Sequence, residues 1–255
     1  MTHTFQNAPN FRAIPSLPTR DGRCLRQGSL YRSGDLSTLA EEEVLQLSAA
    51  NISLVIDLRS RFEREHRPNR YPEKNPPQVI NGDIRIDLRA ANGSLGDALR
   101  ADPTAEGARQ MMHATYQALP QALSPLLKPV VETMIQTPGA TLVLCTAGKD
   151  RTGTLVASLL YMLQVQPQAI ADDYLQTNAR IDLDRMADTS ANLLHNLFGL
   201  TLPRQALDVV NQVEPGYLDT ATQAVRSLHG SGAQWLADAG ISAAHLYALR
   251  EKYLA

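Results

Sequence analysis

Residues that could do chemistry are concentrated between Leu142 and Gly153, which reads LVLCTAGKDRTG. Cys145 follows an apolar run, and Arg151 stands six positions later. Gly148 lies between them and permits a sharp backbone turn without a Cβ clash. A loop of this kind that leads into a helix directs several backbone N–H groups at one point, and the helix dipole adds positive potential there. The segment therefore predicts an anion-binding site beside a cysteine.

The residue types in this loop favour phosphoryl transfer through the thiol. A thiolate is stabilised at a helix N-terminus near a guanidinium, which makes Cys145 a nucleophile. The planar fork of Arg151 can bind two oxygens of a tetrahedral anion, and the Thr152 hydroxyl can donate to the thiolate or to the leaving phosphate. We expect Cys145 to attack phosphorus and water to hydrolyse the phosphocysteine, a scheme that requires neither a metal nor a cofactor.

The leaving oxygen must be protonated, which calls for a nearby carboxylic acid. Asp150 lies inside the loop and is the first candidate. Asp57 ends another apolar run and would reach the same sheet edge if the two strands are parallel. The alternative is a structural aspartate that only braces Arg59 or Arg151.

The pattern Cys145-x5-Arg151-Thr-Gly resembles the signature of the cysteine-dependent tyrosine phosphatase superfamily. The longer run CTAGKDRTG resembles its bacterial tyrosine/dual-specificity and phosphoinositide phosphatase branch, of the LipA/PtpB type. Other markers of that branch recur along most of the chain: Asn10-Phe-Arg12, Leu30 to Gly34, Val55 to Ser60 with Glu63, Asp173 to Leu175, Thr177-Asn178, Tyr217-Leu218, Trp235-Leu236, Gly240 to Ser242 and Leu249-Arg250.

This resemblance implies Cys145 as nucleophile, Arg151 as phosphate clamp and Asp150 as general acid. It implies a protein-tyrosine/dual-specificity phosphatase acting on phosphotyrosine, with phosphoserine, phosphothreonine and phosphoinositides as further substrates and inorganic phosphate or vanadate as active-site ligands. Lys149 matches a basic loop residue associated with phosphoinositide acceptance. The remaining expected substrate-binding residues are Thr146, Ala147, Gly148, Thr152, Asp57 and Arg59.

Two departures from the family pattern leave alternatives open. Leu144 stands where the family has a histidine that orients the loop and tunes the thiol, and Ala13 to Ser16 replace Asp-Leu-Gly-Gly. The first departure motivates a phosphate-binding module without turnover as an alternative. An inositol-polyphosphate phosphatase is another. A nucleotide-binding P-loop is excluded, because Val143 and Asp150 stand where that motif needs Gly and Ser or Thr.

The elements around the loop predict an α/β fold: a phosphatase-like, mostly parallel central sheet flanked by helices, with a helical C-terminal portion. We expect one domain over 1–255, with an irregular arm over 1–28 and mainly helical structure over 167–255. Strands are predicted at 29–33, 53–57, 79–87 and 141–145. Helices are predicted at 38–51, capped by Ser37, and at 106–119, at 122–136 and from Thr152 onward.

Composition narrows the class of protein further. The 255 residues carry 24 Lys and Arg against 26 Asp and Glu, for a net charge of -2, which disfavours a nucleic-acid partner. Two cysteines, Cys24 and Cys145, exclude a disulfide scaffold and a cysteine-ligated zinc cluster, and the six histidines show no ligand spacing. Of the two, Cys24 is interpreted as a structural or surface thiol, with a resolving partner for Cys145 as the alternative.

Three further segments have two interpretations each. The five arginines between Arg59 and Arg70 are either a solvated face or a basic rim for anionic substrates. The leucines at 193, 194, 197 and 200 belong to the core or to a mobile lid. The uncharged run 152–171 is interpreted as a buried helix, so no stable membrane insertion is expected. The polar N-terminus favours a cytoplasmic protein, with secretion by a signal-independent route as the alternative.

Overall fold

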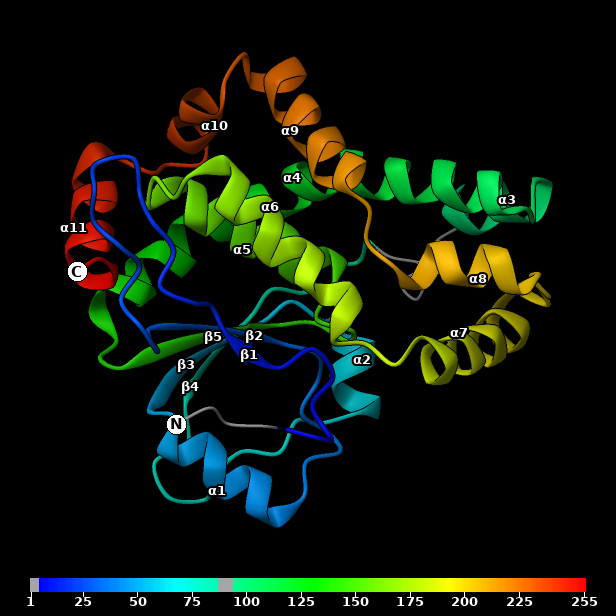
Figure 1. Ribbon diagram of the computed structural model, residues 1–255, viewed down its shortest axis with the longest axis horizontal. Helices are drawn as coiled ribbons and strands as arrows, with labels where there is room; N and C mark the ends of the chain where they lie inside the picture. Colours follow the sequence, from blue (N-terminus) through cyan, green and yellow to red (C-terminus); the bar gives the residue numbers. More distant parts are fainter. Residues whose placement is uncertain (1–4, 87–93) are drawn as a thin grey trace.

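The computed structural model describes residues 5–86 and 94–255, and this part of the chain contains a five-stranded sheet (Figure 1). The strand order is β1-β2-β5-β3-β4. β1 pairs with β2 in the antiparallel sense, and the other three pairings are parallel. The bounds are β1 Arg12–Ala13, β2 Leu30–Ser33, β3 Ile52–Asp57, β4 Gln78–Asn81 and β5 Ala140–Leu144. The predicted fold class is confirmed.

The two central strands, β3 and β5, are the apolar runs expected of strands covered on both faces. Every residue of β5 is buried. Asp57 at the end of β3 is in register with Leu144 at the end of β5. Since both strands are parallel, their carboxyl ends meet at one edge of the sheet, where open α/β sheets bind ligands.

Helices cover both faces of the sheet (Figure 1). On one face, α1 packs its buried Val44 and Leu47 against Val55, Leu142 and Leu144. The opposite face joins the larger core, formed with α4 to α11. The helix bounds are α1 Glu41–Ala49, α2 Arg61–His66, α3 Ser94–Ala101, α4 Ala105–Gln136, α5 Asp150–Met162, α6 Pro167–Leu175, the 3-10 turn η1 Gln176–Ala179, α7 Leu183–Phe198, α8 Arg204–Asn211, α9 Pro215–His229, α10 Gly232–Asp238 and α11 Ala243–Tyr253.

The long helix α4 corrects the prediction of two separate helices at 106–119 and 122–136. It continues through Pro120, Pro125 and Pro129. Proline removes a helix hydrogen bond and disfavours a helix interior. Here α4 packs against α5, α8, α9 and α11, and a row of its apolar side chains is fully buried. Tertiary packing supplies most helix stability, and it outweighs the local cost of the prolines.

Three smaller boundaries also differ from the prediction. Helix α1 begins at Glu41 with Ala40 as N-cap, because the N–H and hydroxyl of Ser37 both donate to Asp35 instead. Strand β4 ends at Asn81, and the backbone leaves the extended conformation at Asp83, whose φ is 49°. The predicted strand's last residue, 87, lies outside the described residues. Helix α5 begins two residues earlier than predicted, at 150.

The C-terminal part of the chain is helical from α6 to α11, as predicted, with breaks at Pro203, Pro215 and two glycine-containing turns. Leu194 and Leu200 are both buried in the larger core, which favours the core interpretation of that leucine stripe. The uncharged run 152–171 forms α5, most of whose residues are buried, and the start of α6. Among the described residues, no helix is both long and apolar enough to cross a bilayer.

Candidate active site

A short loop, residues 145–149, joins β5 to α5 and carries the cysteine. Cys145 is buried and free of any disulfide. Gly148 has a φ of 66°, and a Cβ at this position would overlap the backbone of Ser33 and Gly34. Within the described residues, the N–H groups of residues 146–149 donate no hydrogen bond. The loop therefore presents free amides at the N-terminus of α5, the arrangement that binds anions.

A buried ion network holds the loop from behind. The carbonyl of Gly148 accepts hydrogen bonds from Asn10 Nδ2 at 2.6 Å and from Arg32 Nη2 at 3.0 Å. Arg32 pairs with Asp173 at 2.9 Å, and Arg12 pairs with the same carboxylate at 3.2 Å. These side chains come from the N-terminal arm, β1, β2 and α6, and all are buried. These contacts hold the backbone of the loop at Gly148 in place against the sheet.

Asp173 is the only negative charge among these buried side chains. Burial and the charge of Arg32 lower the pKa of Arg12 to about 10, and the carboxylate of Asp173 opposes that shift. Without it, two guanidinium groups would face each other in a medium that solvates charge poorly.

Arg151 is held by a carboxylate from α2. Its Nη1 donates to Glu63 Oε2 and its Nη2 to Glu63 Oε1, both at 2.8 Å. Glu63 is placed by a capping box, in which it accepts from the N–H of Ser60 at 2.8 Å and donates its own N–H to the Ser60 hydroxyl at 3.2 Å. The hydroxyl of Thr146 also donates to Glu63. The guanidinium is thereby oriented before any ligand binds.

The protonation of Glu63 follows from these contacts. Burial alone would raise the pKa of its carboxyl, but the hydrogen bonds and charge of Arg151, with the donors Thr146 and Ser60, hold that pKa well below its usual range. Glu63 is therefore charged throughout the physiological pH range.

Asp150 begins α5 and keeps 18% of its side chain exposed. Its Oδ1 accepts from the Tyr116 hydroxyl at 2.7 Å and from Lys149 Nζ at 2.8 Å. The Lys149 ammonium also donates to the carbonyls of Val210 at 3.0 Å and Gln212 at 3.2 Å, at the end of α8. An ammonium has three donors, and all three are occupied here. Lys149, expected to bind substrate, is thus turned toward α8 in this structure.

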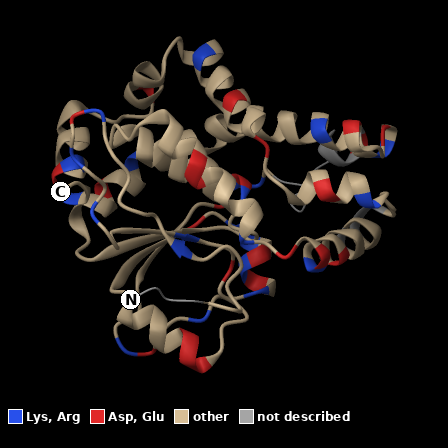
Figure 2. Cartoon of the chain, viewed as in Figure 1, with Lys and Arg blue, Asp and Glu red and all other residues tan. Residues whose placement is uncertain are grey.

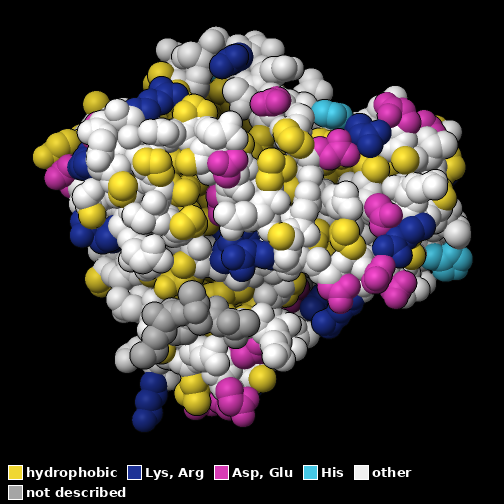
Figure 3. Space-filling model, in the orientation of Figure 1, with side chains coloured by type: hydrophobic (Ala, Val, Ile, Leu, Met, Phe, Trp, Pro, Cys, Tyr) yellow, Lys and Arg dark blue, Asp and Glu magenta, His cyan; other side chains and the backbone are white. Residues whose placement is uncertain are grey.

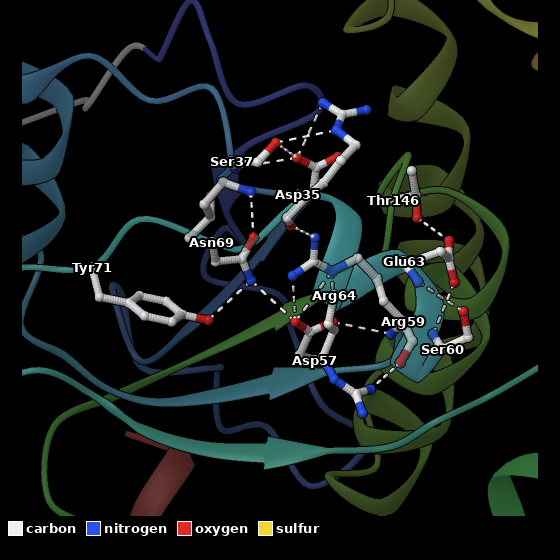
Figure 4. A network of polar contacts seen from close by, with 12 residues as sticks. Asp35, Ser37, Asp57, Arg59, Ser60, Glu63, Arg64, Asn69, Tyr71 and Thr146 are labelled. Carbon is white, nitrogen blue, oxygen red and sulfur yellow. Dashed lines mark hydrogen bonds and ion pairs between the residues drawn. The ribbon is translucent and has the colours of Figure 1, made fainter.

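Asp57 and Arg59, also expected at the substrate, bind each other (Figure 4). Both are buried, and Arg59 Nη2 donates to Asp57 Oδ2 at 2.7 Å while its Nε contacts both carboxylate oxygens. Asn69 adds a hydrogen bond to Oδ2 at 3.1 Å. Asp57 lies at the same sheet edge as Cys145, but both of its carboxylate oxygens accept hydrogen bonds. Asp57 therefore fits a structural role, in which it orients Arg59, better than the role of general acid.

Thr152 is fully buried on α5, and its hydroxyl has no hydrogen-bond partner among the described residues. Buried hydroxyl groups are normally paired, so this one is available to a thiolate or a ligand oxygen. No group of three His, Cys, Asp or Glu within the described residues is placed to hold a metal ion.

Three of the other arginines of the 59–70 cluster lie in ion pairs, and Arg64 donates to the carbonyl of Arg59. Arg61 pairs with Glu65, Arg67 with Asp35, and Arg70 with Glu41. Figure 2 shows acidic and basic residues adjacent on α2, and Figure 3 shows the two signs intermixed over the face in view. This pattern favours a solvated face over a continuous basic rim.

A cavity of about 870 Å³ borders the loop at Thr146 and Ala147. It runs between the N-terminal arm and the start of α7, and its cationic side chains include Arg67, Arg180 and Arg185. Within the described residues, the guanidinium groups of Arg180 and Arg185 form no hydrogen bond or ion pair.

Sequence reasoning did not assign site roles to Arg32, Asp173 or Tyr116. A signal existed for Arg32, since a charged residue inside the short apolar strand Leu30–Ser33 needs a buried partner. The partner could not be identified, because Asp173 is 141 residues away in sequence.

Comparisons with known proteins place the sequence in a family. The model of the tyrosine phosphatase family matches residues 3–255. The triple specificity protein phosphatase PtpB of Mycobacterium tuberculosis is 30% identical over 282 aligned positions, which cover 94% of this chain and 95% of that protein. A protein of Cupriavidus necator named as a tyrosine-protein phosphatase is 28% identical over 239 residues, 92% of this chain and 82% of its own. The crystal structure of TpbA from P. aeruginosa matches 76% of this chain and 96% of its own, at 17% identity and a TM-score of 0.31.

The chain belongs to the tyrosine phosphatase family. The phosphatase predicted from the loop between Cys145 and Gly153 is confirmed at the level of that family.

Replacing Asp173 with asparagine is expected to destabilise the fold. The Asp173→Asn variant leaves Arg12 and Arg32 buried without a counter-charge, which costs about 3–5 kcal/mol. Urea unfolding measures this loss. Asp172→Asn, at an exposed neighbouring position of α6, is the matched control and should unfold like the parent. Equal stability of the two variants would contradict the role of the network.

Replacing Glu63 with glutamine tests the clamp on Arg151. Glu63→Gln should lower the free energy of unfolding by about 3 kcal/mol at neutral pH, because the buried guanidinium of Arg151 loses the carboxylate that pairs with it. The exposed Glu65→Gln is the control. Since folding lowers the pKa of Glu63 from about 4.3, its charge stabilises the fold fully above that pH and progressively less below it. The gap between parent and variant should narrow in acid, and a gap that is independent of pH would count against this assignment.

Proposed function

We propose that this phosphatase hydrolyses phosphate monoesters through a phosphocysteine, with phosphotyrosine in proteins as its principal substrate. The observation that carries the proposal is the placement of Cys145 and Arg151 on either side of one loop, whose amides are free, with Arg151 already oriented by Glu63. Preorganised donors of this kind stabilise the charge of a transferring phosphoryl group.

The reaction follows from this placement. The thiolate of Cys145 attacks phosphorus, and the bond from phosphorus to the leaving oxygen breaks. Loop amides and Arg151 bind the three remaining phosphoryl oxygens. A carboxylic acid gives its proton to the leaving oxygen. Water then attacks phosphorus, gives a proton to the resulting carboxylate, and releases inorganic phosphate and the thiolate.

Asp150 is the better candidate for that acid. It lies at the loop, is partly exposed, and has one carboxylate oxygen without a hydrogen bond among the described residues. Asp57 has both oxygens engaged by Arg59 and Asn69. In this scheme the buried hydroxyl of Thr152, which has no hydrogen-bond partner among the described residues, is available to an oxygen of the bound phosphoryl group.

Two observations favour phosphotyrosine in a peptide over a phosphoinositide. All three donors of Lys149 are occupied by protein oxygens, which disfavours its use for an inositol ring. The cavity of about 870 Å³ beside Thr146 and Ala147 offers space for peptide residues next to the phosphotyrosine, and Arg180 and Arg185 in its lining would attract acidic ones. The relative named for triple specificity motivates phosphoserine, phosphothreonine and phosphoinositides as secondary substrates.

Replacing Cys145 with serine tests the nucleophile. Cys145→Ser is expected to reduce turnover of p-nitrophenyl phosphate to background, because an alkoxide does not form near neutral pH, while inorganic phosphate still binds to the amides and Arg151. Calorimetry measures phosphate binding, and Cys24→Ser is the control that should retain full activity. A fully active Cys145→Ser variant would contradict the proposal.

Replacing Asp150 with asparagine tests the acid. Asp150→Asn should slow aryl phosphates with poor leaving groups by about a hundredfold or more, the usual contribution of general acid catalysis. Substrates with good leaving groups should be slowed much less, since their phenolates need no proton. Rates across a series of substituted phenyl phosphates give this comparison, and equal slowing of the whole series would assign the acid to another residue.

Activity in the presence of EDTA separates this proposal from a phosphate-binding module. Sustained hydrolysis eliminates the binding module and any need for a dissociable metal. A panel of phosphotyrosine, phosphoserine and phosphothreonine peptides, phosphoinositides and inositol polyphosphates then ranks the substrates. A preference for inositol polyphosphates would favour the alternative enzyme class.

A further inference from the structure

Three tyrosines from three different helices meet at Asp150. Tyr116 on α4 stacks on Tyr217 of α9, with ring centroids 5.1 Å apart, and meets Tyr174 of α6 edge-to-face at 6.3 Å. Tyr116, Tyr174 and Tyr217 are almost fully buried. Such a polar cluster inside a core needs a reason beyond packing, because phenylalanine would fill the same space without a hydroxyl to satisfy.

Two of these hydroxyls form a directed chain that ends on the carboxylate. Tyr174 donates to the Tyr116 oxygen at 2.6 Å, and Tyr116 donates to Asp150 Oδ1 at 2.7 Å. Burial, together with the charge of Asp150, raises the pKa of Tyr116 and of Tyr174 well above the usual value. Both hydroxyls therefore remain protonated and keep their donor roles at any pH at which the enzyme works.

The chain distinguishes the two oxygens of Asp150. Oδ1 accepts from both Tyr116 and Lys149, while Oδ2 accepts no hydrogen bond within the described residues. Protonation of an oxygen that already accepts two hydrogen bonds is unfavourable, because it would disrupt those bonds. In the acid role proposed for Asp150, the transferred proton is therefore assigned to Oδ2, which accepts no hydrogen bond among the described residues.

The motif glycine at 153 leaves room for this chain. A Cβ on Gly153 would lie 3.0 Å from two ring carbons of Tyr174. Glycine thus lets α6 approach α5 closely enough for the Tyr174 hydroxyl to reach Tyr116.

We propose that Tyr116 is a positioning residue for general acid catalysis: its hydroxyl, oriented by Tyr174, holds Oδ1 of Asp150 so that Oδ2 delivers the proton to the leaving oxygen. The inference rests on the proposed role of Asp150. When the P–O bond breaks, the Oδ2 proton moves to the leaving oxygen, and the carboxylate that remains is stabilised by the donors Tyr116 and Lys149. When water attacks phosphorus and the bond from phosphorus to sulfur breaks, that carboxylate accepts a proton from the attacking water.

The test compares leaving groups in the Tyr116→Phe variant. The kcat for a poor leaving group, phenyl phosphate, should fall about tenfold or more, the size expected for losing one hydrogen bond to a charged group. The kcat for p-nitrophenyl phosphate should fall less, and KM should stay within twofold for both. Tyr174→Phe should produce a smaller change in the same direction, because it removes only the orientation of the Tyr116 hydroxyl.

Tyr217→Phe is the matched control, because its hydroxyl belongs to the same cluster but has no partner among the described residues. It should keep the parent's leaving-group dependence. In an Asp150→Asn background, Tyr116→Phe should have no further effect on the leaving-group dependence. Thermal unfolding identifies any variant that fails to fold, and Tyr174→Phe then carries the test.

The outcomes distinguish a failure of the positioning role of Tyr116 from a failure of the acid role of Asp150. If Asp150→Asn leaves the leaving-group dependence unchanged, the acid assignment fails and the positioning role fails with it. If Asp150→Asn changes it but a folded Tyr116→Phe behaves like Tyr217→Phe, the acid stands and the positioning role is overturned. Equal slowing of both substrates by Tyr116→Phe would likewise overturn it, since that result indicates a general structural effect.

Discussion

The site depends on one electrostatic constraint: an anion-binding loop must keep its own amides unpaired while its carbonyls are firmly held. A loop with free N–H groups would collapse onto any nearby acceptor unless something else fixed its path. Here the carbonyl of Gly148 is held by Asn10 and Arg32, and the charge of Arg32 is balanced by Asp173. The donors are thereby directed away from the sheet and toward the ligand.

The cations around the loop are also held by partners within the protein. Each cation at the site has a carboxylate or carbonyl partner that fixes its direction: Glu63 for Arg151, and Asp150 with the end of α8 for Lys149. A carboxylate paired with a buried guanidinium weakens the positive potential of that guanidinium. In return the guanidinium is already oriented, so it does not have to reorganise when the substrate binds. The guanidinium groups of Arg180 and Arg185, at the neighbouring cavity, have no such partners among the described residues.

The helices beyond the sheet contribute the contacts of Asp150, the proposed general acid. Asp150 receives contacts from α4 through Tyr116, from α6 through Tyr174, and from α8 through Lys149. The continuity of α4 through three prolines matters for this reason. A helix broken at residue 120, as local propensity predicts, would not tie Tyr116 near its start to the apolar face that packs the rest of α4 against the core.

The sequence by itself determined the mostly parallel sheet, the loop between Cys145 and Arg151, and the phosphatase family, because these depend on residues close together in the chain. It also placed Asp57 at the correct edge of the sheet. Only the tertiary structure decided which neighbours each polar side chain would have: Asp57 with Arg59, Ser37 with Asp35, Lys149 with α8, and Asp150 with Tyr116. Two of these pairings join residues two positions apart, but Tyr116 and Asp150 are 34 residues apart, and in the buried network Arg12 and Asp173 are 161 residues apart. A buried charge takes whichever partner the packed helices and strands bring within reach, and no local pattern encodes that distance.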